Sequence, residues 1–115
     1  MKKETKNLEF DWFDFSEAEF LNAVAHGDEQ EDDIYGFVSC TDGPDKFLID
    51  IHFEHYDSRN RGFEMEIYEE LPEGGHGNWY RGTRKVRSAK NYRSFVNRAE
   101  KALADEIADI KEERP

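Results

Sequence analysis

Most side chains of this sequence that could do chemistry are carboxylates, and several stand at alternate positions of two apolar-rich stretches. These stretches are residues 46–56 and 63–71, and the carboxylates are Asp50, Glu54, Glu64, Glu66 and Glu70. On one face of a β-strand alternate side chains repeat about every 6.8 Å, and neighbouring strands lie about 4.8 Å apart. The pattern therefore predicts a fixed lattice of carboxylates on an exposed sheet face. Like charges opposite one another destabilise a sheet, so we interpret their retention as a sign of use in binding.

The charge is segregated along the chain. The formal net charge is −11, yet residues 74–98 contain seven basic side chains and no acidic one. Residues 1–73 contain 21 acidic and 6 basic side chains, and five of the acids form a run: Asp28, Glu29, Glu31, Asp32 and Asp33. A strongly negative protein repels nucleic acid and anionic membranes and attracts basic surfaces. Simple solubility is the alternative explanation of the same charge.

The basic segment has two interpretations. Its candidate site residues are Arg81, Arg84, Lys85, Arg87, Lys90 and Arg93. If residues 79–87 form a strand beside 63–71, the first four should pair with Glu64, Glu66, Glu69 or Glu70. Alternatively, Trp79 and Tyr80 beside Arg81 resemble stacking residues next to a phosphate contact, as in nucleic-acid binding.

Other reactive residues are isolated. His26, His52, His55 and His76 are scattered, and positions 52 and 55 of a strand face opposite ways. Cys40 is the only cysteine, so it has no disulfide partner and suits a small core residue. Residues 74–77 lack the Gly-Lys-Ser/Thr of a phosphate-binding P-loop. Carboxylates on an exposed face have no obvious cause for a raised pKa. We therefore predict no metal site, no cofactor and no enzymatic activity.

Periodicity and capping signals define the elements that would position these residues. Ser16 and Glu19 have capping-box spacing, with Phe15 and Phe20 as a hydrophobic staple, which predicts a helix over about 17–26. Strands are predicted over 34–40 (apolar on both faces), 46–56, 63–71 and 79–87, with turns at 42–45, 57–62 and 72–78. A long amphipathic helix begins near Ser88 or Asn91, with this apolar stripe: Tyr92, Phe95, Val96, Ala99, Leu103, Ile107 and Ile110.

These elements predict one α+β domain over residues 1–115. It comprises a short N-terminal helix, a three- to four-stranded antiparallel sheet and the long C-terminal helix packed on one sheet face. The aromatic segment upstream of residue 16 should pack on the core through Leu8, Phe10, Trp12, Phe13 and Phe15, whereas residues 1–7 and 112–115 should fray. The sequence shows no signal peptide and no membrane-spanning run, so we expect a cytoplasmic protein.

Two class-level resemblances bear on function. The order of helix, three strands and helix, with basic residues near the start of the last helix, resembles the double-stranded-RNA-binding domain, which implies RNA binding through 81–98. Size, acidity and element order are similar to those of small phage-encoded inhibitors of CRISPR or restriction nucleases. That resemblance implies an inhibitor that occupies a basic nucleic-acid-binding site of a partner protein by DNA mimicry. An immunity protein or antitoxin that neutralises a basic toxin would follow the same electrostatic logic.

Overall fold

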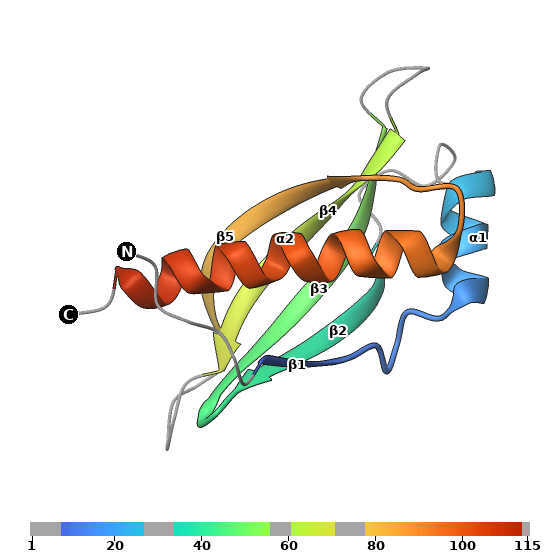
Figure 1. Cartoon of the computed structure of the whole chain (residues 1–115). Helices are drawn as coiled ribbons and strands as arrows, with labels where there is room; N and C mark the ends of the chain where they lie inside the picture. The colour runs from blue at the N-terminus through green and yellow to red at the C-terminus, as the bar shows by residue number, and fades with distance from the viewer. Residues whose placement is uncertain (1–7, 27–33, 56–60, 71–77, 114–115) are drawn as a thin grey trace.

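The computed structural model describes residues 8–26, 34–55, 61–70 and 78–113 (Figure 1). The elements in chain order are β1 (Leu8–Asp11), α1 (Glu17–His26), β2 (Ile34–Asp42), β3 (Asp45–His55), β4 (Arg61–Glu70), β5 (Asn78–Arg87) and α2 (Tyr92–Glu112). The predicted α+β architecture is confirmed. The prediction of three or four strands is wrong, because Leu8–Asp11 pairs with β2 and adds a fifth strand.

The sheet is an antiparallel meander in which every strand pairs with its neighbours in sequence, in the order β1-β2-β3-β4-β5. Asp42 and Asp45 face each other across a two-residue turn, as predicted. Gly43 has a φ of 61° in this turn, a backbone conformation that glycine adopts without steric cost. The strands also extend into segments predicted to be turns, because Gly62 belongs to β4 and Asn78 to β5.

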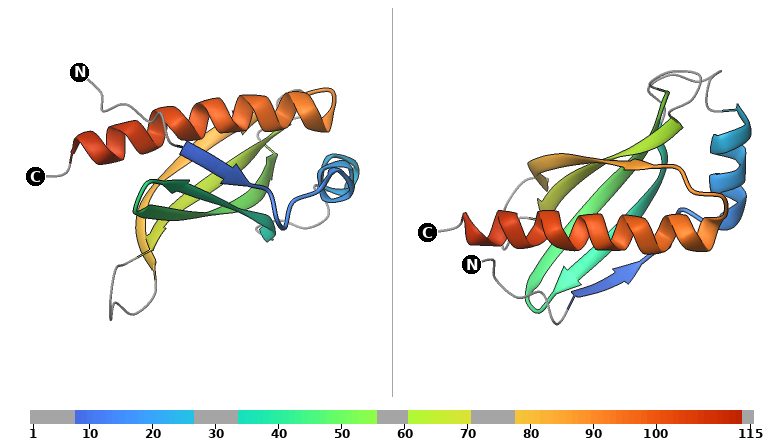
Figure 2. Two further views of the ribbon diagram at one scale, coloured as in Figure 1. Left: turned by 60° about the horizontal axis from the view of Figure 1, so that its bottom comes forward. Right: turned by 45° about the horizontal axis from the view of Figure 1, so that its top comes forward.

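α2 lies across one face of the sheet, and α1 stands beyond one end of it (Figures 1 and 2). The predicted stripe of α2 forms the helix side of the core, with Phe95, Ala99, Leu103 and Ile107 fully buried. At the end nearest α1 the core is aromatic. The rings of Phe63 and Phe95 lie 4.5 Å apart between centroids, and those of Phe20 and Phe95 lie 5.3 Å apart. These large rings supply the apolar area that a chain poor in aliphatic residues needs.

Both helices begin at capping residues. The Glu19 carboxylate accepts a 3.0 Å hydrogen bond from the Ser16 backbone N–H, as a capping box requires, and the Ser16 hydroxyl also donates to that carboxylate. Asn91 caps α2 by accepting a 2.9 Å hydrogen bond from the Ser94 N–H. α2 continues to Glu112, the first of the residues predicted to fray.

The segment before α1 is fastened to α2. Trp12 Nε1 donates to Glu100 Oε2 at 2.8 Å, and the Tyr92 hydroxyl donates to the Phe15 carbonyl. β2 crosses this segment closely: a Cβ on Gly36 would lie 2.1 Å from the Asp14 carbonyl oxygen, so only glycine fits there. The expected packing of Phe13 on the core is wrong, because that side chain is 58% exposed.

β2 also differs from its prediction as a strand apolar on both faces. Val38 and Cys40 are buried, but Phe37 and Ser39, which face the other way, are only half-buried. In the part of the chain that the structure describes, neither helix has the length and hydropathy needed to cross a bilayer.

Candidate functional site: the open face of the sheet

The face of the sheet opposite α2 is covered by no element that the structure describes, and we call it the open face (Figure 2). Alternation along β3 separates the two faces. Phe47, Ile49 and Ile51 are fully buried beneath α2, whereas Leu48 and Asp50 between them are half-buried. The period of two that suggested an exposed lattice in the sequence is therefore present in the sheet.

The register brings four of the predicted carboxylates together on the open face. Asp50 of β3 stands opposite Glu66 of β4, and Glu64 is the preceding alternate residue of β4. Glu70 follows beyond Tyr68 and lies close to Lys46. Glu54 stands opposite Gly62, in the same alternation, and its side chain lies outside the described residues. The predicted acidic run of Asp28, Glu29, Glu31, Asp32 and Asp33 also lies outside the described residues.

β1 adds two acidic residues that the prediction missed. Leu8 and Phe10 are packed against the core, and Glu9 and Asp11 alternate with them and are exposed. Glu9 stands opposite Thr41 and Asp11 opposite Ser39, so both belong to the open face. The signal was present in the sequence as the strict alternation of Leu8–Asp11, but four residues are too few to distinguish a strand from an irregular segment.

Part of this negative charge is balanced by nearby cationic groups. Lys46 Nζ lies 3.7 Å from Glu70 Oε2. The His52 imidazole, which is charged only when it is protonated, has its Nε2 3.0 Å from Glu66 Oε1. Lys85 of β5 stands opposite Glu64. Arg87, two residues on, stands opposite Gly62 and belongs to the same face. Among the described residues, the open face thus presents six carboxylates from three strands against Lys46, Lys85 and Arg87, and it keeps a negative excess.

The structure provides a cause for a raised pKa at Asp50, which the sequence did not reveal. Partial burial raises the pKa of Asp50 above its ordinary value of 3.8, the facing Glu66 raises it further, and His52 opposes the shift. The flanking side chains Phe37 and Leu48 belong to the same face and are themselves half-buried. Asp50 and Glu66 therefore form a cross-strand pair in which two negative charges repel each other and one of them is partly buried.

An aromatic band lies beside the acids. Leu48 stands opposite Tyr68 and Tyr68 opposite Tyr80, and the two tyrosine rings meet edge-on with centroids 5.5 Å apart. The Tyr68 hydroxyl donates to Glu66 Oε2 at 2.9 Å, and this hydrogen bond raises the pKa of Tyr68 to about 12. Tyr80 is 51% exposed. This band was not predicted: Tyr80 was interpreted as a stacking residue beside Arg81, and its pairing with Tyr68 depends on the register of β4 and β5.

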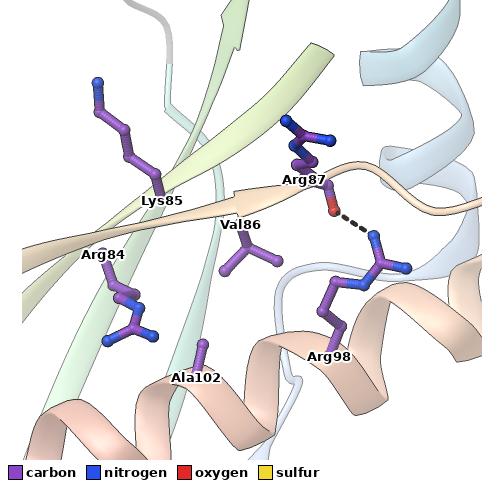
Figure 3. A pocket seen from close by; sticks show the side chains of 6 residues that line it. All are labelled: Arg84, Lys85, Val86, Arg87, Arg98 and Ala102. Atoms are coloured by element: carbon purple, nitrogen blue, oxygen red, sulfur yellow. Dashed lines mark hydrogen bonds between the residues drawn. The ribbon is translucent and has the colours of Figure 1, made fainter. Parts of the chain in front are cut away.

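The late basic residues are distributed over both sides of β5. Arg81 Nε lies 3.6 Å from Glu69 Oε1, which confirms pairing with β4 for that residue. The same prediction is wrong for Arg84, whose Nη1 lies 3.2 Å from Glu106 Oε1 of α2. Lys85 and Arg87 extend on the side of β5 away from α2 (Figure 3), and Lys90 and Arg93 are exposed. The six predicted basic residues therefore do not form one surface, and Arg81 and Arg84 do not cover the carboxylates of the open face.

Reactive groups elsewhere are buried or isolated. Cys40 is fully buried, and burial raises the pKa of its thiol to about 12, so it is a core residue rather than a nucleophile at neutral pH. Within the described ranges, no three His, Cys, Asp or Glu side chains are grouped closely enough to hold a metal ion. Of the four histidines, only His52 has a described side chain.

Comparison with known proteins does not assign this site. Protein-family models, curated proteins and solved structures gave no match to this chain. Function is therefore inferred from the geometry and the charge of the open face.

Proposed function

We propose that this protein is a non-enzymatic binding protein whose open face occupies a basic site of a partner protein. The observation that carries the proposal is the register of β3 and β4. It holds Asp50, Glu64, Glu66 and Glu70 on the face that α2 leaves uncovered. Neither Arg81 nor Arg84 approaches them, because these two pair with Glu69 and Glu106. A rigid array of this kind complements a positive patch and accelerates association with it.

The aromatic band supports a protein as the occupant of this face. Tyrosines are enriched at the centres of protein interfaces, where they contribute contact area at low entropic cost. Tyr68 and Tyr80 lie directly beside the carboxylates, so a basic partner with apolar groups between its cations would gain both kinds of contact. Charge alone would attract any cation, whereas the tyrosines of the aromatic band add contacts that depend on the shape of the partner's surface.

The narrower form of the proposal is inhibition by nucleic-acid mimicry. Duplex DNA presents one negative charge per about 1.7 Å of its axis. Carboxylates about 6.8 Å apart along a strand and about 4.8 Å apart between strands form a comparable regular array. The partner would then be a CRISPR or restriction nuclease whose nucleic-acid groove is basic. An immunity protein or antitoxin that covers a basic toxin is the alternative form, and the same face would serve it.

The test uses three defined basic nucleases: an RNA-guided effector, a restriction endonuclease and a bacterial toxin DNase. Each is loaded with a fluorescent DNA duplex, and displacement of the duplex by this protein is measured by anisotropy. We expect stoichiometric displacement from one of them, with an affinity that falls as NaCl is raised from 50 to about 200 mM.

Variants connect that displacement to the open face. The double variant Glu64→Lys/Glu66→Lys should lower the association rate about tenfold or more, since charge complementarity acts mainly on that rate. The matched control is Asp105→Lys/Glu113→Lys, which makes the same charge change at exposed positions of α2 and the residue after it. Tyr80→Ala should instead raise the dissociation rate. Equal loss in the control, or displacement from none of the three nucleases, would overturn the proposal.

A further inference from the structure

A shallow hollow lined mainly by basic residues lies between β5 and α2. It has a volume of about 450 Å³ and is lined by Arg84, Lys85, Val86, Arg87, Arg98 and Ala102 (Figure 3). Four of these six residues carry a positive charge. The hollow is separate from the carboxylates of the open face, because Arg84 and Val86 point toward α2 (Figure 3).

Two guanidinium groups border the hollow from opposite sides. Arg84 extends from β5 and Arg98 rises from α2, with Val86 and Ala102 between them (Figure 3). Arg98 Nη1 donates to the carbonyls of Arg87 and Ser88 at 3.2 and 3.3 Å. Arg84 Nη1 donates to Glu106 Oε1 at 3.2 Å. These contacts hold both side chains in place through one terminal nitrogen each. Because a guanidinium has five N–H donors, most donors of each group remain for a ligand.

The electrostatic balance around the hollow is positive. Lys85 and Arg87 extend away from α2 and add positive potential from the other side of β5 (Figure 3). Glu106 contacts Arg84, and Lys85 stands opposite Glu64, so Arg87 and Arg98 contribute most of the positive potential. Residues 74–98, from which five of the six lining residues come, contain no Asp or Glu. A cation would be repelled here and an anion attracted.

The chemistry of the lining selects the kind of anion. We infer that the hollow is an oxyanion site that takes a phosphate group. Arginine presents its donors as a planar fork that fits two oxygens of a phosphate. The apolar floor of Val86 and Ala102 offers no acceptor that would compete for these donors. A phosphorylated small molecule and the phosphodiester of a nucleic-acid strand share this chemistry.

The experiment titrates the ¹⁵N-labelled protein separately with inorganic phosphate, pyrophosphate and a short single-stranded thymidine oligonucleotide. Ionic strength is held constant with NaCl. Saturable shifts are expected at the Nε–H signals of Arg84 and Arg98 and at the Ala102 amide. Arg84→Gln and Arg98→Gln should each raise the Kd for pyrophosphate about tenfold or more, because a charge-assisted hydrogen bond is lost.

Two further variants keep the test decisive. Arg93→Gln removes one exposed cation of α2 outside the hollow and should change the Kd less than twofold. Ala102→Glu places a negative charge on the floor without removing an arginine and should abolish saturation. This variant covers the possibility that Arg98→Gln fails to fold, since Arg98 also anchors the end of β5.

The outcomes separate the ligand sources. Tighter binding of pyrophosphate than of the oligonucleotide, with shifts confined to the hollow, supports a phosphorylated small molecule. Tighter binding of the oligonucleotide, with additional shifts at Trp79 and Tyr80, supports a nucleic-acid strand. Shifts that do not saturate, that spread evenly over the cations, or that Arg93→Gln weakens as much as Arg84→Gln would overturn the inference. None of these results bears on the acidic open face.

Discussion

Asp50 connects stability and binding at the scale of a single residue. Its side chain is half-buried opposite Glu66, and burial and that neighbour raise the pKa of its carboxyl above 3.8. A carboxyl whose folded pKa is raised stabilises the fold most when protonated, below its unfolded pKa. That contribution is lost as the pH rises through the folded value. At neutral pH the ionised Asp50 therefore opposes folding, and its retention is consistent with a role in binding.

The variant Asp50→Asn tests this balance. It keeps the size of the side chain and removes the charge, so at pH 7 it should stabilise the protein by about 0.5 kcal/mol, the size of an opposed like-charge pair. The gain should shrink as the pH falls through the raised folded pKa, and it should vanish below 3.8, where the carboxyl is protonated in both the folded and the unfolded state. Urea unfolding at several pH values measures the difference, with Asp105→Asn, an exposed helix carboxylate, as the control. A destabilised Asp50→Asn at pH 7 would show that Asp50 makes a favourable contact in the fold.

At the scale of the elements, a contact of Lys111 with two aspartates fastens the end of α2 to the sheet. Lys111 Nζ donates to Asp42 Oδ2 at 2.5 Å and lies 3.0 Å from Asp45 Oδ2, so the last turns of α2 are fastened to the β2–β3 turn. Asp42 is only 6% exposed, so Lys111 is the cation that faces a largely buried carboxylate. Burial lowers the pKa of Lys111, but the hydrogen bonds to Asp42 and Asp45 outweigh it, and the net shift is upward.

Lys111→Met should therefore destabilise the protein by about 2–3 kcal/mol, because it leaves a buried carboxylate without its cation. Lys101→Met, at an exposed position of the same helix, should change the stability by less than about 0.5 kcal/mol. Since the folded pKa of Lys111 is raised, the loss should be constant across neutral pH and decline only above 10.5. Thermal unfolding of the three proteins between pH 6 and 11 would show this. A loss below 1 kcal/mol would mean that water replaces Lys111 at Asp42.

The elements also show what local sequence determines and what it does not. Alternation in β3 and β4 predicted their inward and outward residues, because the period of a strand is fixed by its backbone. Both helices were predicted from local signals as well, because capping residues mark where a helix begins and the apolar stripe repeats with the helical period. Leu8–Asp11 was not predicted as a strand, since its only hydrogen-bonding partner is the distant β2. The Arg84–Glu106 pair depends on the rotation of α2 over β5, and neither segment encodes that rotation alone. The hollow beside this pair could not be predicted for the same reason.

At the scale of the whole molecule, the net charge of −11 is large for a body of 42 × 31 × 23 Å. At 0.01 M salt the Debye length is about 30 Å, so charges on most of the molecule repel one another, whereas at 0.15 M it is about 8 Å and only neighbours interact. Such self-repulsion destabilises a compact state.

We therefore expect the urea midpoint to rise as NaCl is raised from 10 to 150 mM. The urea midpoint of Glu64→Gln/Glu66→Gln should rise less with salt, because this variant has less charge to screen. The midpoint of Asn22→Gln, a change at an exposed and uncharged position, should rise as much as that of the wild type. A midpoint that falls with salt would show instead that local attractions such as His52–Glu66 and Lys111–Asp42 outweigh the long-range repulsion. The negative field that the open face offers a partner would then be largely neutralised within the molecule.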